Sequence, residues 1–86
     1  MIFDRLKAID SLGRGEVQNA VVLPASNKFD SWLLLLIDVN GKRHTVTRAR
    51  KSVIKIYKSL DSALTDARVM GFKTINVELE PEKGAA

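Results

Sequence analysis

The sequence predicts a small α+β fold, in which an antiparallel β-sheet carries one main helix across a face and a short helix precedes the sheet. Five separate stretches are rich in apolar and β-branched residues and are bounded by glycine, proline or polar turns, which is typical of β-strands. One stretch, residues 60–70, instead has apolar residues at helical spacing. The expected order along the chain is α-β-β-β-β-α-β.

The N-terminal region is predicted to form a short amphipathic helix and then a strand. The apolar stripe of the helix, within residues 2–12, is formed by Ile2, Leu6 and Ile9. The triplet Gly13-Arg14-Gly15 ends this helix, because glycine adopts a positive φ at little cost. A strand is expected over residues 17–23, and Pro24 closes it because proline has no amide hydrogen to donate.

Residues 32–39 and 42–48 are predicted to pair as a hairpin through Asn40-Gly41, a strong signal for a two-residue turn. Residues 53–57 are expected to add a third strand to this meander. Side chains alternate between the two faces of a strand. The side chains expected to face the helix are Leu33, Leu35, Ile37, Val39, His44, Val46, Ile54 and Ile56. The side chains expected on the outer face are Trp32, Leu34, Leu36, Asp38, Arg43, Thr45, Thr47, Val53, Lys55 and Tyr57.

The C-terminal region is predicted to form the main helix and a last strand. Ser59 is in the N-cap position of the helix at 60–70, and Gly71 is expected just beyond its end. In residues 73–79 apolar and polar side chains alternate, as in a half-buried strand. We therefore expect one domain over residues 1–79 and a flexible tail over residues 80–86.

Length and composition narrow the class of protein. A chain of 86 residues has room for one hydrophobic core, and 45% apolar residues favour a folded protein. The chain has no cysteine, which agrees with a cytoplasmic location. Its longest apolar run, residues 32–37, is far shorter than the roughly 20 residues that cross a bilayer. The N-terminus lacks the basic leader of a signal peptide, so we expect no membrane association.

Positive charge is concentrated in one segment. Residues 42–58 contain seven basic residues and no acidic one, while the whole chain has a net charge of +4. The basic residues are Lys42, Arg43, Arg48, Arg50, Lys51, Lys55 and Lys58. The other 69 residues therefore sum to −3. This asymmetry favours a polyanionic partner.

Two functions are compatible with this surface. In the first, the protein is a non-enzymatic accessory or regulatory factor that binds DNA, with RNA as the alternative. The nucleic-acid-binding residues would be Lys42, Arg43, Thr45, Thr47, Arg48, Arg50, Lys51, Lys55, Tyr57 and Lys58. In the second, the protein is an interaction or homodimerisation module, and its apolar interface is formed by Trp32, Leu34 and Leu36.

The sequence offers little catalytic chemistry. His44 is the only histidine and lies among cations, and there is no cysteine nucleophile. Asp61 and Asp66 are five residues apart on the predicted helix, so they do not share a face. We therefore expect no enzymatic activity, no metal, no cofactor and no small-molecule substrate.

Residues 32–71 also carry a resemblance to known DNA-binding modules. They comprise three short strands with a tight turn, a basic middle, and Ile56-Tyr57-Lys58-Ser59-Leu60-Asp61-Ser62-Ala63 leading into one helix. This pattern resembles the AP2-like class, the three-stranded-sheet-plus-helix modules at the N-termini of phage and transposon integrases. The stretch from Tyr57 to Leu64, with Gly71-Phe72, is also similar to closing segments of small accessory proteins of plasmids and other bacterial mobile elements.

The AP2-like resemblance implies that one sheet face enters a DNA groove. The implied residues are Arg43, Thr45, Thr47, Lys55 and Tyr57. The chain differs from that class by an added N-terminal helix and strand and by a further strand at 73–79. It also places the apolar Leu34 and Leu36 on the expected reading face.

Overall fold

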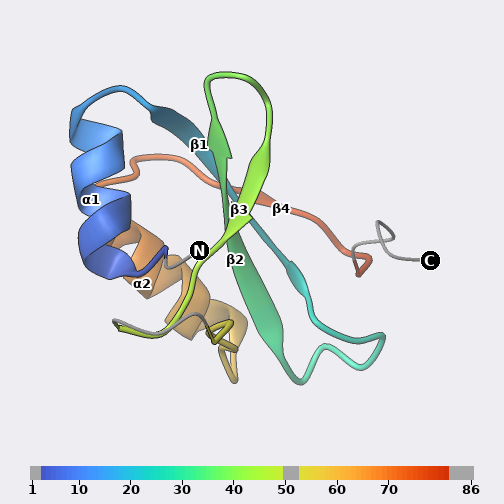
Figure 1. The fold of residues 1–86 in the computed structure, drawn as a ribbon. Helices are drawn as coiled ribbons and strands as arrows, with labels where there is room; N and C mark the ends of the chain where they lie inside the picture. The colour runs from blue at the N-terminus through green and yellow to red at the C-terminus, as the bar shows by residue number, and fades with distance from the viewer. Residues whose placement is uncertain (1–2, 50–52, 82–86) are drawn as a thin grey trace.

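The computed structural model describes residues 3–49 and 53–81, which contain two helices and a four-stranded sheet (Figure 1). The elements are α1 (Arg5–Gly13), β1 (Val17–Pro24), β2 (Trp32–Asp38), β3 (Arg43–Thr45), α2 (Leu60–Met70) and β4 (Asn76–Val77). The strand order in the sheet is β3-β2-β1-β4. The pairs β1–β2 and β2–β3 are antiparallel, whereas β1 and β4 are parallel. The α+β class is confirmed, but the sheet is mixed rather than antiparallel.

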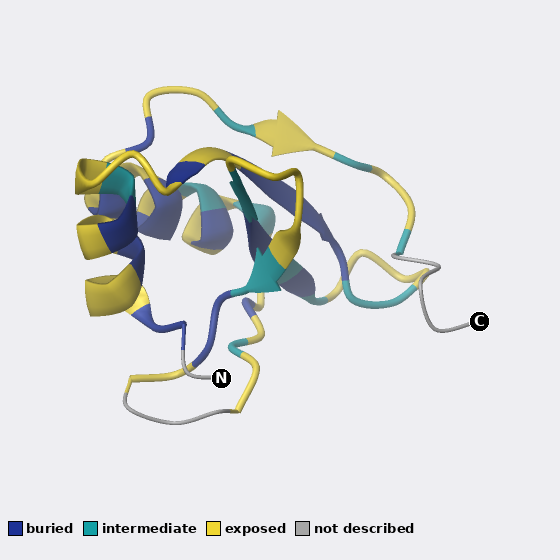
Figure 2. Cartoon of the chain, turned by 45° about the horizontal axis from the view of Figure 1, so that its top comes forward, coloured by how far each residue is buried: buried dark blue, intermediate teal, exposed yellow. Residues whose placement is uncertain are grey.

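Both helices pack on one face of the sheet, with their buried sides toward the strands (Figures 1 and 2). The main core lies between the helices and the sheet and is formed by Phe3, Ala8, Val17, Ala20, Val22, Trp32, Leu34, Leu36, Val46, Tyr57, Ala63, Ala67, Met70 and Phe72. A smaller apolar cluster on the opposite face of the sheet contains Val21, Leu23 and Leu35, with Leu33 and Ile37 packed against it. The sheet is therefore apolar on both faces.

Helix α2 has the boundaries that the sequence predicts. Ser59 is its N-cap, and the Ser59 hydroxyl accepts a hydrogen bond from the amide of Ser62 at 3.1 Å. Gly71 ends the helix with a φ of +115°. A Cβ at position 71 would lie 3.1 Å from a Leu12 methyl group, so this glycine also allows α1 and α2 to approach closely.

Helix α1 begins later than expected and turns a different side to the core. Asp4 is the N-cap and accepts a hydrogen bond from the Lys7 amide at 3.0 Å. The buried residues of α1 are Ala8 and Ser11, whereas Leu6 and Ile9 are exposed. The prediction that Leu6 and Ile9 face the core was therefore wrong, and Ile2, predicted for the same stripe, lies outside the described residues. Small side chains on the buried side let the helix lie close to its neighbours.

The hairpin between β2 and β3 is confirmed, but its turn is one residue longer than predicted. The Asp38 amide donates to the Lys42 carbonyl, which leaves residues 39–41 as a three-residue turn with Gly41 at a φ of +83°. Leu36 is consequently opposite His44. A two-residue turn would have paired residue 37 with His44.

This register decides which side of β2 faces the helices. His44 and Val46 face the helices as predicted, since His44 stacks on Phe3 and Val46 is in the main core. Because paired residues share a face, the one-residue difference moves the other side of β2 inward. Trp32, Leu34 and Leu36 therefore lie in the main core, so their predicted place on an outer interface was wrong. The β2 side chains that were expected to face the helices lie elsewhere. Leu33, Leu35 and Ile37 are on the opposite face of the sheet, and Val39 is exposed in the turn.

Residues 53–57 do not form the expected strand. They make two isolated antiparallel bridges, Thr47 with Ile54 and Trp32 with Tyr57. Three of their side chains lie on the side opposite to the prediction, because Tyr57 is buried in the core while Ile54 and Ile56 are exposed. Tyr57 can be buried because its hydroxyl finds a buried acceptor on α2.

The last predicted strand is short and pairs unexpectedly. Only Asn76–Val77 is β-structure, and it pairs in parallel with β1. The expected tail lies partly outside the described residues, which end at Pro81.

Neither described helix has the length and apolar character needed to cross a membrane. The radius of gyration, 11.9 Å, is that of a compact chain of this length.

The register of β2 can be tested by truncating one leucine. Leu34 has no exposed surface, so Leu34→Ala should lower the free energy of unfolding by about 2–5 kcal/mol. Ile56→Ala, at an exposed aliphatic position, should change it by less than about 0.5 kcal/mol. Urea unfolding followed by tryptophan fluorescence measures both. Equal effects of the two substitutions would contradict the register.

Candidate functional site

Three of the residues predicted to contact nucleic acid, Arg48, Arg50 and Lys51, fall within residues 48–53, and a backbone hydrogen bond joins the two ends of this segment. We call residues 48–53 the basic loop. At its base the Arg48 amide donates to the Val53 carbonyl at 2.8 Å, and the Lys55 amide donates to the Val46 carbonyl at 3.0 Å. Arg48 and Val53 are exposed. Arg50 and Lys51, predicted for the same loop, lie outside the described residues.

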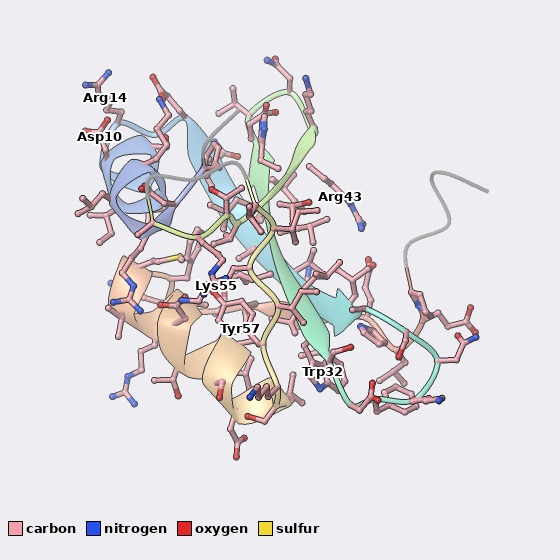
Figure 3. The ribbon with its side chains drawn as sticks, turned by 60° about the horizontal axis from the view of Figure 1, so that its bottom comes forward. Asp10, Arg14, Trp32, Arg43, Lys55 and Tyr57 are labelled. Carbon is pink, nitrogen blue, oxygen red and sulfur yellow. The ribbon has the colours of Figure 1, made fainter. Side chains whose placement is uncertain are left out.

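The structure separates the predicted cations into three groups. Arg48, Lys55 and Lys58 belong to the basic loop and the segment that follows it. Lys42 lies at the turn of the hairpin, at the other end of β3 from this loop (Figure 1). Arg43 forms an ion pair with Glu78, with Nη2 2.9 Å from Oε2. Figure 3 shows Lys55 and Tyr57 beside α2 and Arg43 away from that helix.

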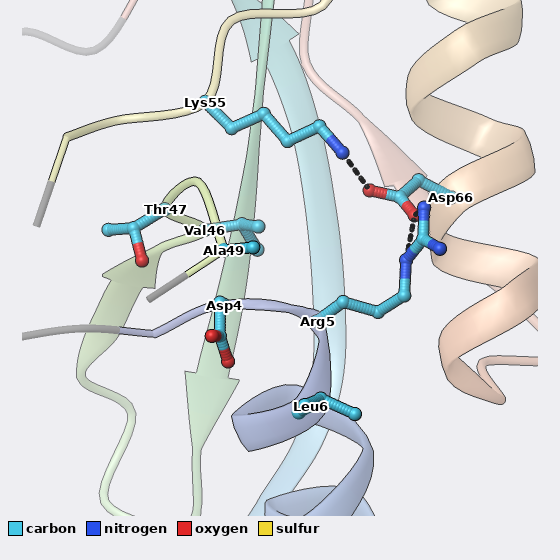
Figure 4. Close-up of a pocket in the computed structure, with 8 residues that line it drawn as sticks. All are labelled: Asp4, Arg5, Leu6, Val46, Thr47, Ala49, Lys55 and Asp66. Carbon is cyan, nitrogen blue, oxygen red and sulfur yellow. Dashed lines mark hydrogen bonds and ion pairs between the residues drawn. The ribbon is translucent and has the colours of Figure 1, made fainter. Parts of the chain in front are cut away.

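Lys55 and Tyr57 converge on a buried carboxylate that the sequence prediction did not include. Asp66, on α2, is only 4% exposed. Its Oδ1 accepts a hydrogen bond from Nε of Arg5 at 2.8 Å, and its Oδ2 accepts from Nζ of Lys55 at 3.2 Å (Figure 4). The Tyr57 hydroxyl also donates to Oδ2. We call Arg5, Lys55, Tyr57 and Asp66 the Asp66 cluster.

The cluster keeps Asp66 ionised in spite of its burial. Burial raises the pKa of this carboxyl, but the hydrogen bonds from Tyr57 and Lys55, the Lys55 charge and the hydrogen bond from Arg5 lower it more, so that the net pKa lies below its ordinary range. Burial raises the pKa of the Tyr57 phenol, and the hydrogen bond to Asp66 raises it further. The tyrosine is therefore a neutral donor and the aspartate a charged acceptor at neutral pH.

A cavity of about 400 Å³ lies where the basic loop approaches α1 (Figure 4). It is lined by Asp4, Arg5, Leu6, Val46, Thr47, Ala49, Lys55 and Asp66. Its two acidic and two basic side chains leave it without net charge at neutral pH. The cavity is therefore a poor receptor for an anion, and Arg5 and Lys55 are already engaged with Asp66.

A second hollow, of about 380 Å³, is lined by Arg48, Ile54, Lys55 and Ile56. The isoleucines are 48% and 58% exposed. No acidic side chain lines this hollow. Here the structure brings together two of the predicted basic residues, and it adds exposed aliphatic side chains that the prediction had placed in the core.

The hydroxyl-bearing residues of the predicted sheet surface are less accessible. Thr47 is buried, and its Oγ1 accepts a hydrogen bond from the Phe3 amide at 2.8 Å. Tyr57 is buried within the Asp66 cluster, and Thr45 is half-buried. The expectation that Thr47 and Tyr57 lie on an open groove-reading face was therefore wrong. It failed because the segment after β3 turns these side chains inward to satisfy backbone and carboxylate groups.

His44 has an acidic partner that its sequence neighbours do not reveal. Nε2 of His44 lies 2.8 Å from Oδ2 of Asp38. The other Asp38 oxygen accepts hydrogen bonds from the amides of Asn40 and Lys42 at 2.9 Å. The hydrogen bond from His44 and that from the Lys42 amide together hold the pKa of Asp38 below its usual range. This arrangement explains a structural role for His44, which joins the hairpin turn to Phe3.

The burial of Asp66 had a signal in the sequence. Asp66 is three residues after Ala63 and four before Met70, so it lies on the same stripe of α2 as the buried residues. A carboxylate on the apolar side of a helix requires a partner. The identity of that partner could not be predicted, because Arg5 is 61 residues away in sequence.

Within the described residues, no group of three or more histidine, cysteine, aspartate or glutamate side chains is arranged to hold a metal ion. No protein-family model matches the chain, and no match was found among curated proteins or solved structures. The function must therefore be argued from the surface itself.

Removing the Asp66 charge should destabilise the fold. Asp66→Asn keeps the shape of the side chain but loses charge-assisted hydrogen bonds, and it should lower the free energy of unfolding by about 2–3 kcal/mol. Asp10→Asn removes an exposed ion pair with Arg14 and should cost less than about 0.5 kcal/mol. Chemical unfolding of both variants measures the difference. Equal, small costs would show that Asp66 does not hold the segments together.

The contribution of Asp66 should also depend on pH in one direction. Its pKa is lower in the folded protein than in the unfolded chain, so the charged carboxylate stabilises the fold above its unfolded pKa. That stability is lost as the pH falls through the folded pKa. The difference in unfolding free energy between the wild type and Asp66→Asn should therefore be largest near pH 7 and shrink below about pH 4. A difference that stays constant or grows on acidification contradicts the assignment.

Proposed function

We propose that this protein is a non-enzymatic nucleic-acid-binding accessory or regulatory protein that contacts the phosphate backbone through the basic loop and the segment after it. The observation that carries the proposal is the uncompensated charge of this region. Residues 42–58 contain seven cations and no acid, and Arg48 and Lys58 are exposed. No acidic side chain in residues 3–49 or 53–81 forms an ion pair with either of them.

The geometry favours binding through this loop over reading of a groove by the sheet. Arg43 is paired with Glu78, Lys55 with Asp66, and Thr47 is buried. The strongest remaining phosphate contacts are Arg48 and Lys58, with Arg50 and Lys51 added from the sequence. Contacts of this type position a protein on nucleic acid without specifying a base sequence. We therefore propose backbone binding of low sequence specificity, which suits an accessory role.

The salt dependence of binding tests this function. Four cations in contact with phosphates should give a log–log slope of about −3 to −4 for a mixed-sequence DNA duplex, because each contact contributes about −0.9. Arg48→Gln should weaken binding and make the slope shallower by about one unit. Fluorescence anisotropy over a series of salt concentrations measures both quantities.

The matched control is Arg68→Gln, which removes an exposed arginine from α2, outside the basic segment. It should leave affinity and slope nearly unchanged. Thermal unfolding establishes that both variants are folded. Absence of binding at low salt, or equal effects of the two substitutions, would contradict the proposed function.

A further inference from the structure

We propose that the ligand of this surface is double-stranded DNA, and that its deoxyribose-phosphate backbone lies in the hollow formed by Arg48, Ile54, Lys55 and Ile56. This inference rests on the proposed function and adds the class of nucleic acid. It follows from the combination of charge and aliphatic surface in one place, and from the positions of the aromatic rings.

The hollow has the two kinds of group that a sugar-phosphate backbone needs. The guanidinium of Arg48 is exposed and can donate to phosphate oxygens. Lys55 directs its ammonium to Asp66 at 3.2 Å, and its partly exposed side chain also lines the hollow. Ile54 and Ile56, which are both exposed, line the same hollow as Arg48 and offer apolar contact. Phosphate oxygens and the carbon face of a sugar thus have separate partners.

The position of the isoleucines favours deoxyribose over ribose. Lys55 and Tyr57 both direct their side chains to Asp66. Side chains alternate along an extended segment, so Ile54 and Ile56 share the side away from the Asp66 cluster. Isoleucine has no group that can accept or donate a hydrogen bond. A ribose 2′-hydroxyl pressed against these side chains would lose water without gaining a partner, whereas deoxyribose would lose nothing.

The aromatic residues favour a duplex over a single strand. All five aromatic residues of the chain lie in described segments. Four of them, Phe3, Trp32, Tyr57 and Phe72, are buried in the main core. Phe29 is exposed in the loop between β1 and β2, where its ring packs against Trp32. Single-strand binding generally stacks successive bases on exposed rings, and the rings of this protein are used in packing.

The test compares three labelled probes of one mixed sequence at one salt concentration. The probes are a DNA duplex, an RNA duplex and the single DNA strand, and the readout is fluorescence anisotropy. We expect the DNA duplex to bind most tightly and the RNA duplex roughly ten-fold more weakly, as one unpaired hydroxyl would cause. Equal or tighter binding of RNA or of the single strand overturns the inference and leaves the proposed function standing. Binding of none of the probes overturns both.

A pair of variants assigns the preference to the hollow. The double substitution Ile54→Thr and Ile56→Thr keeps β-branched side chains and supplies hydroxyls that can pair with a 2′-hydroxyl. It should reduce the preference for the DNA duplex over the RNA duplex to less than about three-fold if each hydroxyl forms a hydrogen bond. Val77→Thr, at an exposed position on the opposite edge of the sheet, should keep the wild-type preference.

The same variants distinguish two origins of a preference for DNA: the contact of the isoleucines with the sugar, and the different helix geometry of DNA and RNA duplexes. A preference that arises only from the different geometries of DNA and RNA helices would be unchanged in the isoleucine double variant. That result would overturn the assignment to Arg48, Ile54, Lys55 and Ile56. Circular dichroism spectra of the variants, matched to that of the wild type, establish that the comparison is made on folded proteins.

Discussion

The buried carboxylate of Asp66 is the constraint on which the arrangement of this protein depends. It joins three parts of the chain that are distant in sequence: Arg5 at the start of α1, Lys55 and Tyr57 after the basic loop, and α2 itself. A charged group with 4% exposure can be kept only if its oxygens are satisfied. Donors converge on both Asp66 oxygens, so the position of each donor-bearing segment is restricted by the same side chain.

The cluster also determines which side chains reach the surface near the basic loop. Tyr57 and Lys55 turn toward α2, so the intervening Ile56 and the preceding Ile54 must point away from it. The hydrogen bonds of Lys55 and Tyr57 to Asp66 thus leave the two isoleucines to form the apolar part of the hollow. It also means that Lys55 serves the fold through its ion pair with Asp66, whereas Arg48 is exposed. Under the proposed function, the fold and the ligand would therefore use different basic residues of this segment.

Much of the fold could be predicted from local signals, and the failures have identifiable physical causes. Helix α2 was predicted correctly because Ser59, the apolar spacing and Gly71 are all local to it. The two faces of β2 were assigned wrongly, because residues 32–37 are apolar at every position. One extra residue in the turn shifts the register by one and exchanges the two faces of the strand. The strand at 53–57 was overestimated because β-branched residues also suit a short exposed bridge. Periodicity carries no information where both faces are apolar.

The candidate site was predicted only in part, because local sequence shows the basic residues but not their long-range partners. A run of basic residues without acids is visible in the sequence, and the structure keeps Arg48 and Lys58 exposed. The pairing of Arg43 with Glu78 and of Lys55 with Asp66 joins residues that are 35 and 11 positions apart, which no local pattern can indicate. The tertiary contacts therefore leave fewer than seven cations without an acidic partner in this stretch, and the proposed binding surface is smaller than the sequence predicts.

The most direct test of the account is to map the bound surface by NMR, by titrating a mixed-sequence DNA duplex into the isotope-labelled protein and following the backbone amides. The account predicts that the largest chemical-shift changes fall on residues 46–58, while the hairpin turn at 39–41 and the exposed side of α1 change little. Shifts concentrated on the hairpin turn or on the helices would contradict it, because the nucleic acid would then be recognised by a surface that Asp66 does not organise. An absence of any shift at low salt would contradict the nucleic-acid-binding function itself.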